Sequence, residues 1–524
     1  MTTKELADIL FPDVMERPED FEKRYPPRKL LQGAEVTRFG ASPTGYINIG
    51  GLYTAFISWK IAKMSNGKFI LRIEDNNQRD LIDDGIKNFV NALTSYDISF
   101  DEGYIDTENE IGDYGPYIQS KRQNIYQVYV KELVSKGFAY PCFCSVEKLE
   151  GLRELQRTNK EQTGYYGKYA ECRNLSPKVA AERALMGESF VIRLRAEYLS
   201  DYTEEYYDDL IKGKVRLSKS DLDLIILKES GLPDYHFAHV VDDHLMGTTI
   251  ITRCEDWLPS LHTHLALFSL MGWKPPRYAH IGALSIKLNE RSIVKISKKL
   301  GDAVTVDYYL KKGYTPEAFK AYFAGIASNI SDELIFENKV EDSFSLSNMS
   351  SHGAIFDIAK LNFVSKFILE KNELNLLERR FSQWIAKYHP ELFEIITCDE
   401  KFLSEILRII RGVEAPRRSV ACCEDILKEV MPYFNAPHKG SLIDGDLDLL
   451  KGFMFRIRER ELENIDAVRF LLTDFANEQG VSLKRIAAAL RRMIVGSDYS
   501  PSVFEMVMIF GLNRIGFWIK ELDA

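Results

Sequence analysis

Residues 38–51 (RFGASPTGYINIGG) combine the end of an apolar run, a tight turn and the start of a helix. Pro43 fixes φ and Gly45 tolerates a positive φ, so SPTG is typical of a turn. Glycines 50 and 51 then open an amphipathic helix predicted over residues 52–64. The free backbone N–H groups and the dipole at a helix start attract anions, so this run predicts a phosphate cradle.

A second motif, residues 294–299 (VKISKK), carries closely spaced lysines in a stretch with few signals of regular structure. Lys295 and Lys298 bracket an Ile-Ser pair. Ammonium groups on such a loop can neutralise the charge that grows on the α- and β-phosphates when pyrophosphate leaves. A solvated basic loop is the alternative interpretation, and the two motifs together are more specific than either one alone.

Composition narrows the class of protein. The 524 residues suffice for two to four domains. The net charge of -9 gives no overall positive charge that would attract nucleic acid, although a local basic patch can still bind it. Seven unevenly spaced cysteines do not indicate a disulfide framework. The sequence shows no apolar run of about 18 residues and no signal or transit pattern, so we expect no membrane span and a cytoplasmic location.

Alternating elements must position the two motifs. A strand over 68–73 and a helix over 81–93 predict a parallel sheet in residues 36–120, and a helix follows between 121 and 140. A second β/α stretch runs from 222 to about 320, with strands at 222–228 and 249–252. Beyond about residue 345, helical periodicity dominates. The helices predicted there span residues 355–371, 374–387, 401–411, 423–434, 467–478 and 481–493.

The two motifs resemble the two signatures of class I aminoacyl-tRNA synthetases. Four further segments, in the same order and at similar spacing, resemble the glutamyl-tRNA synthetase family of bacterial type: 71–75 (LRIED), 115–120 (GPYIQS), 235–247 (YHFAHVVDDHLMG) and 253–258 (RCEDWL). Glutaminyl enzymes share both signatures, but their C-terminal half is built from β-barrels. The helical run of this chain therefore favours the glutamyl family.

The resemblance implies an α/β Rossmann-type catalytic half with an inserted α/β acceptor-binding domain, followed by an all-α anticodon-binding half. It implies ATP-dependent ligation of L-glutamate to tRNA(Glu) through a glutamyl-adenylate, with ATP and Mg²⁺, by a monomer. The implied domains are an N-terminal lead (1–35), the catalytic domain (36–120 and 216–325), the insertion (121–215), a stem-contact helical region (326–400) and the anticodon-binding domain (401–524).

Family roles carry over to matching positions. The implied glutamate-binding residues are Arg38, Gly40, Ser42, Glu74, Tyr235, His239 and Arg253; the two arginines would hold carboxylates, and Glu74 the α-ammonium. The implied ATP-binding residues are Ser42, Thr44, Asn48, Gly50, Gly51, Asp256, Leu288, Lys295, Ser297 and Lys298. Of these, Asn48, Gly50, Lys295 and Lys298 are the catalytic candidates. The alternatives are a surface ion pair of Arg253 with Glu255 or Asp256, and a solvated strand end at Glu74.

Three clusters remain. The basic residues Arg417, Arg418, Lys484 and Arg485, together with Asn77 near the tRNA 3′ end, are candidate tRNA contacts, with Arg485 and Arg492 on one helix side; a solvated face is the alternative. Cys142, Cys144 and Cys172, with Tyr169 or else Tyr165 or Tyr166 as fourth ligand, form a candidate zinc site; buried free cysteines are the alternative. His236 and His239 could share a metal, but the resemblance places them beside the glutamate pocket, with Asp242 and Asp243 ordering the backbone.

Three positions depart from the family pattern: Asn48 stands for His, Asn77 for Asp, and Lys299 for Arg. Two alternatives remain, the first of them motivated by Asn48 and Asn77. One is a divergent paralogue that binds RNA without charging it, and the other is an enzyme that glutamylates an acceptor other than tRNA. The helical half argues against the second alternative, because truncated relatives with small acceptors lack an anticodon module.

Overall fold

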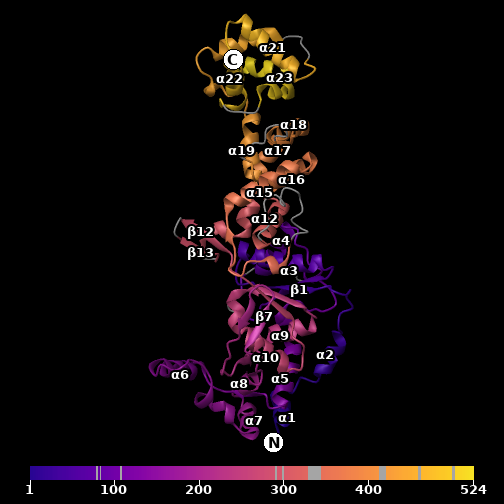
Figure 1. Cartoon of the computed structure of the whole chain (residues 1–524), viewed down its shortest axis with the longest axis vertical. Coiled ribbons are helices and arrows are strands. Elements are labelled where there is room, and N and C mark those ends of the chain that lie inside the picture. Colours follow the sequence, from indigo (N-terminus) through magenta and orange to yellow (C-terminus); the bar gives the residue numbers. More distant parts are fainter. Residues whose placement is uncertain are drawn as a thin grey trace. The chain divides into compact units, whose positions relative to one another are not determined.

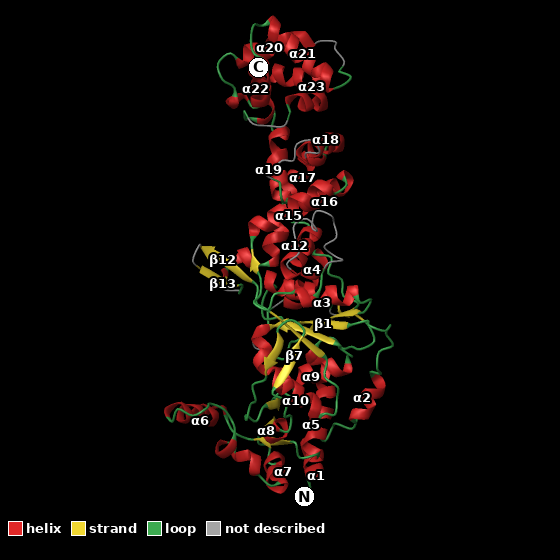
Figure 2. Cartoon of the chain, in the orientation of Figure 1, coloured by secondary structure: helices red, strands yellow, loops and turns green. Residues whose placement is uncertain are grey.

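The computed structural model describes residues 1–77, 81–82, 84–106, 109–289, 292–297, 300–328, 344–411, 420–457, 462–498 and 502–523. It divides into two compact units, one of Met1–Asp307 with Phe323–Phe356 and one of Tyr308–Tyr322 with Asp357–Ala524 (Figure 1). All strands in the described ranges belong to the first unit, and the second is helical (Figure 2). In those ranges, no helix has the length and apolar character needed to cross a membrane.

A parallel sheet forms the centre of the first unit. β1 pairs with β2 and β2 with β3, all parallel, while β10 pairs in parallel with β11. The Thr249 amide, just before β10, donates to the Val36 carbonyl of β1 at 2.9 Å, so the two strand sets adjoin. The bounds are β1 Val36–Ala41, β2 Lys68–Ile73, β3 Glu102–Tyr104, β4 Glu110–Ile111, β10 Ile250–Cys254 and β11 Arg277–Ile281.

Helices α3 (Ile49–Met64), α4 (Gly85–Ser95), α9 (Tyr235–Leu245) and α10 (Leu261–Leu270) accompany these strands. Helix α3 begins three residues before the predicted start, because the Asn48 side chain accepts a hydrogen bond from the Gly51 amide at 2.8 Å and caps the helix. Helix α4 begins at Gly85 rather than at 81, which corrects the prediction. The Ile82 amide donates instead to the Pro43 carbonyl at 3.1 Å, which ties this stretch to the turn after β1.

The chain between α5 (Gln123–Ser135) and α9 contains most of the predicted insertion, residues 121–215. Its three-stranded antiparallel sheet has the order β5-β6-β9, where β9 is shorter than the predicted strand at 222–228, and β7 and β8 form a hairpin. Helices α1 (Thr3–Leu10) and α2 (Pro18–Arg24) pack on α5. The remaining bounds are β5 Ala139–Cys142, α6 Val146–Thr158, α7 Pro177–Leu185, β6 Val191–Leu194, α8 Ala196–Ser200, β7 Tyr206–Asp209, β8 Gly213–Arg216 and β9 Ile225–Leu227.

A small sheet of β12 (Ser285–Asn289), β13 (Ser292–Lys295) and β14 (Ile355–Phe356) follows. The lysine motif, residues 294–299, begins at the end of β13. All six predicted C-terminal helices are present. The first starts three residues later than predicted, at Ile358, because Ile355 and Phe356 pair with β12, and the last starts two residues later, at Leu483, after its N-cap Ser482. The helix bounds are α11 Val306–Lys312, α12 Pro316–Ser328, α15 Ile358–Lys371, α16 Leu374–Tyr388, α17 Pro390–Thr397, α18 Glu400–Arg411, α19 Cys423–Phe434, α20 Asp446–Ile457, α21 Ile465–Glu478, α22 Leu483–Val495 and α23 Val503–Asp523.

Candidate active site

A cavity of about 750 Å³ lies at the carboxyl ends of β1, β2, β10 and β11, the edge where open α/β sheets bind ligands. Residues of both sequence motifs line it together. The predicted site residues in its wall are Arg38, Gly40, Ser42, Asn48, Gly50, Gly51, Glu74, Asn77, Tyr235, Arg253, Asp256 and Lys295. Thr44, His239 and Ser297 are not among the lining residues, the Leu288 side chain is not described, and Lys298, Arg417 and Arg418 lie outside the described residues.

The start of α3 forms one wall of the cavity. Asn48 uses its amide oxygen to cap the helix, which leaves the amide NH₂ group as a donor. A Cβ at Gly50 would lie 3.3 Å from that amide oxygen, and one at Gly51 would lie 3.1 Å from Cγ1 of Ile47. Two glycines therefore fit closely around the cap. The Gly51 amide is used by Asn48, so an anion at this helix start would meet the other N–H groups of the first turn.

Lys295 lines the same cavity as this helix start. Its ammonium group contacts the carboxylate of Asp256 and lies 3.7 Å from Sγ of Cys254. Burial opposes the charged form, but these partners outweigh it and raise the Lys295 pKa. Both side chains of the pair are about half exposed, so water screens the pair and separating it costs little.

Arg38 and Arg72 share one buried counter-ion, Asp243. The Asp243 carboxylate accepts from Nε of Arg38 at 3.0 Å and from Nη1 of Arg72 at 2.8 Å. Burial raises the Asp243 pKa, but the two guanidinium groups outweigh burial and lower it. This corrects the expectation that the aspartates order the backbone: Asp243 compensates the charge of two buried guanidinium groups, and Asp242 likewise accepts from Nε of Arg122 at 2.7 Å.

Glu74 is positioned by its neighbours and is not a solvated strand end. Its carboxylate accepts from Arg72 at 2.9 Å, and a Cβ on Gly40 would lie only 2.4 Å from the same oxygen. Gly40 therefore provides the space that lets Glu74 fold across β1 into the cavity.

Arg253 is 5% exposed and is held without a carboxylate. Its guanidinium donates to His280 at 3.0 Å, to the Trp257 carbonyl at 3.1 Å and to His264 at 3.0 Å. The alternative of an ion pair with Glu255 or Asp256 is wrong, because these residues pair with Lys212 and Lys295 instead. Arg38, Arg253, Glu74 and the start of α3 thus line one cavity, which suits an amino acid with an extra carboxylate beside a phosphate chain.

Comparison with known proteins identifies the family. The model of tRNA synthetases class I (E and Q), catalytic domain, matches residues 35–363, and an anticodon binding domain matches residues 383–516. A glutamate–tRNA ligase of Acetivibrio thermocellus is 34% identical, and the match covers 100% of this chain and 100% of the relative. One of Clostridium perfringens is 37% identical over 83% of this chain and 80% of the relative.

The chain belongs to the glutamate–tRNA ligase family.

A crystal structure of a glutamate tRNA ligase from Elizabethkingia meningosepticum, in complex with its amino acid, shares the fold. It has a TM-score of 0.77 at 24% identity and covers 93% of this chain and 99% of its own. The family models and relatives confirm the family resemblance, and this shared fold confirms the fold class predicted from the sequence.

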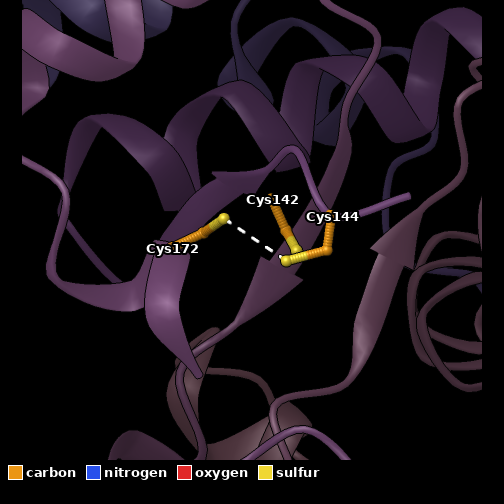
Figure 3. Close-up of side chains that lie close together, drawn as sticks. All are labelled: Cys142, Cys144 and Cys172. Atoms are coloured by element: carbon orange, nitrogen blue, oxygen red, sulfur yellow. Dashed lines mark hydrogen bonds between the residues drawn. The ribbon is translucent and has the colours of Figure 1, made fainter. Parts of the chain in front are cut away.

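The cysteine cluster of this ligase family member lies in the insertion, away from the cavity lining. The sulfur atoms of Cys142, Cys144 and Cys172 lie within 4.8 Å of one another, and no other such group of potential metal ligands occurs in the described ranges (Figure 3). The hydroxyl of Tyr169, one of the three predicted fourth ligands, donates to Glu161. The hydroxyl oxygen of Tyr165, another of them, lies 3.4 Å from Sγ of Cys144.

The histidines of α9 form no metal group with the aspartates. Nδ1 of His236 lies 3.0 Å from Nε2 of His264, and His239 contacts Arg38 and Tyr278 behind the cavity wall. Tyr235 packs on Trp257, with their ring centroids 4.3 Å apart.

The basic face predicted on α22 is partly internal. Arg492 is buried, and its Nε donates to the fully buried Asp446 at 2.7 Å, while Arg485 contacts the same carboxylate. Arg485 and Arg492 do lie on one side of α22, but the alternative of a solvated face does not hold for Arg492, because both guanidinium groups contact Asp446 of α20. Lys484 is exposed.

The sequence analysis missed residues behind the cavity wall, of which Arg72, Asp209, His264 and His280 matter most. Arg72 carried a signal, because a charged residue within the apolar run FILRI must find a partner once buried. The histidines carried none, since their partners come from distant parts of the chain.

Proposed function

We propose that the protein ligates L-glutamate to tRNA(Glu) with ATP through a glutamyl-adenylate. One observation carries the proposal: the start of α3 and Lys295 line the same cavity as Arg38, Glu74 and Arg253. A triphosphate fits the first pair and an acidic amino acid fits the second set.

The substrate is oriented by charge. Arg38 and Arg253 receive the two carboxylates of glutamate, for which forked guanidinium donors are suited, and Glu74 receives the α-ammonium. Gly40 and Ser42 border this part of the cavity, and Tyr235 closes it, with His239 positioned behind. A neutral glutamine side chain would leave one guanidinium without an anion.

The first step joins the substrates. An oxygen of the α-carboxylate attacks the α-phosphorus of MgATP in line, the bond to the bridging oxygen breaks, and pyrophosphate leaves. Asn48 and the amides near Gly50 and Gly51 bind phosphate oxygens, and Lys295 moves from Asp256 to the charge that develops. Thr44, Ser297 and Lys298 complete this set, and Leu288 contacts adenine through its backbone.

In the second step, a ribose hydroxyl of the terminal adenosine attacks the adenylate carbonyl, and AMP leaves. No side chain needs to form a covalent intermediate. Cys254 lines the cavity, but burial raises its pKa, so it stays a neutral thiol and a poor nucleophile.

The tRNA is assigned to the other regions. The insertion (121–215) receives the acceptor end, with Asn77 near its 3′ terminus, residues 326–400 contact the stem, and residues 401–524 the anticodon. Arg417, Arg418, Lys484 and Arg485 are the proposed contacts there. We also propose a cytoplasmic monomer, which size-exclusion chromatography with light scattering would check for oligomeric state.

A structural Zn²⁺ is proposed at Cys142, Cys144 and Cys172. Three sulfur ligands within 4.8 Å suit zinc, and Tyr165 supplies the nearest oxygen. Hydrogen bonding from Cys172 lowers the pKa of the Cys142 thiol, although burial opposes this. Metal analysis of the purified protein tests the proposal, and a zinc content near zero would favour buried free cysteines.

Aminoacylation tests the function. Radiolabelled glutamate should charge purified tRNA(Glu), and a parallel reaction with tRNA(Gln) shows whether that acceptor is used. Family behaviour predicts almost no glutamate-dependent pyrophosphate exchange without tRNA. Tight tRNA binding without charging would favour the RNA-binding paralogue, and adenylate formation without transfer to tRNA would favour another acceptor.

A further inference from the structure

The partners of Arg253 differ in kind from those of Arg38. Arg38 contacts the carboxylate of Asp243 directly, whereas no carboxylate of the described residues forms an ion pair with Arg253. Both arginines are buried, and both line the cavity. A buried cation without a direct anion needs a strong arrangement of acceptors, and two histidines provide it here.

The hydrogen bonds define the tautomers of both histidines. Arginine only donates, so Nε2 of His280 and Nδ1 of His264 must accept from Arg253 and carry no proton. His280 therefore bears its proton on Nδ1, which donates to Oδ2 of Asp209 at 2.6 Å. His264 bears its proton on Nε2, which donates to Nδ1 of His236 at 3.0 Å.

Asp209 is suited to fix the His280 tautomer. Its carboxylate is fully buried and also accepts from the backbone amides of His280 at 3.1 Å, Ile211 at 3.0 Å and Lys212 at 2.9 Å. All of these partners are donors, so the Asp209 carboxylate stays charged. A charged carboxylate only accepts hydrogen bonds, so Nδ1 of His280 must carry the proton. Burial and the nearby Arg253 charge lower the His280 pKa despite Asp209, and His280 is neutral at pH 7.

We propose that Asp209 and His280 are positioning residues for glutamate recognition, which rests on the function proposed above. The neutral His280 accepts the hydrogen bond from Arg253, and the charged Asp209 lies behind His280 without contacting the guanidinium group. The guanidinium group is thereby oriented, yet no protein carboxylate competes with the carboxylate of the substrate for it. A carboxylate in direct contact would weaken the attraction that Arg253 exerts on glutamate.

Two substitutions of His280 separate its two contacts. His280→Gln retains an oxygen acceptor near the Nε2 position and can still meet Arg253. His280→Asn retains an amide near the Nδ1 position and can still meet Asp209, but it leaves Arg253 without that acceptor. In Asp209→Asn, the amide NH₂ group can point at Nδ1 of His280 and favours the tautomer with its proton on Nε2. That N–H would then point at a guanidinium N–H of Arg253, so two donors would meet.

The expected result is a split between KM and kcat in tRNA charging. The glutamate KM should rise about 10- to 100-fold in His280→Asn and Asp209→Asn, the range for losing a hydrogen bond to a charged group, and less than about fivefold in His280→Gln. The ATP KM and kcat should stay within about threefold of wild type. Equal glutamate KM values in all variants, or equal losses of kcat in the Gln and Asn variants, would overturn the proposal.

A second measurement is independent of catalysis. Nitrogen-15 NMR of the nine histidines should show a neutral Nδ1–H tautomer that disappears in His280→Gln. An Nε2–H tautomer or an imidazolium at pH 7 would overturn the proposal even in a fully active enzyme. If the wild type charges no tRNA, the proposed function fails, and the tautomer together with glutamate affinities from calorimetry still decides the role of His280. If Asp209→Asn does not fold, the two His280 variants decide it.

Discussion

Replacing Asp243 by Asn tests the electrostatic support of the cavity. Asp243 is fully buried in α9 and contacts Arg38 at 3.0 Å, Arg72 at 2.8 Å and the Thr248 hydroxyl at 3.0 Å. Asn has nearly the same volume, so the substitution creates no large cavity. It removes the charge and turns one acceptor into a donor that faces a guanidinium group.

The magnitude follows from burial. Removing one partner of a buried ion pair costs about 3–5 kcal/mol, because the remaining charge is left without compensation. Here two guanidinium groups lose their common anion. Since the Asp243 pKa is lowered in the fold, the carboxylate is ionised at pH 7, and the full effect applies there. We expect a loss of about 3–5 kcal/mol in the free energy of unfolding of the first unit.

Urea unfolding followed by hydrogen-exchange mass spectrometry measures this loss, because peptides from β1 and α9 report on the first unit separately from those of α18–α23. Glu154→Gln is the matched control. Glu154 forms an ion pair with Arg157 at 3.3 Å on α6, with both side chains well exposed, and should cost less than about 1 kcal/mol. A similar small cost for both variants would refute the reasoning.

Four further predictions follow from single contacts. Lys295→Ala should lower kcat about 10²- to 10³-fold with the glutamate KM unchanged, and a proportional rise in that KM would contradict its role. Gly40→Ala should raise the glutamate KM more than the ATP KM, because its Cβ would lie 2.4 Å from Glu74. Zinc content by mass spectrometry should fall in Tyr165→Phe and not in Tyr169→Phe. Burial lowers the pKa of His264, whereas histidine in the unfolded chain is protonated below about pH 6.5. The free energy of unfolding, measured with urea, should therefore fall below about pH 6.5 by up to about 1.4 kcal/mol per pH unit. A free energy that stays constant down to pH 5.5 would contradict this.

Periodicity and turn chemistry predicted much of the fold. The helices of the second unit and strand β2 follow from local patterns, because apolar spacing and capping residues act within a few positions of one another. Predictions failed where a distant contact overrides the local pattern. The start of α4 is set by the Pro43 turn, and the start of α15 by the pairing of β14 with β12.

The sequence by itself determined the family, the cradle around Asn48 and the main cavity residues, because these reside in contiguous motifs whose chemistry depends on short spacing. Only the tertiary structure decided how those residues are held. Asp209, His264 and His280 come from separate elements, and Tyr165 rather than Tyr169 approaches the cysteines. Hydrogen bonds and charge compensation act through space over a few ångströms, so partners far apart in the chain leave no local pattern to read.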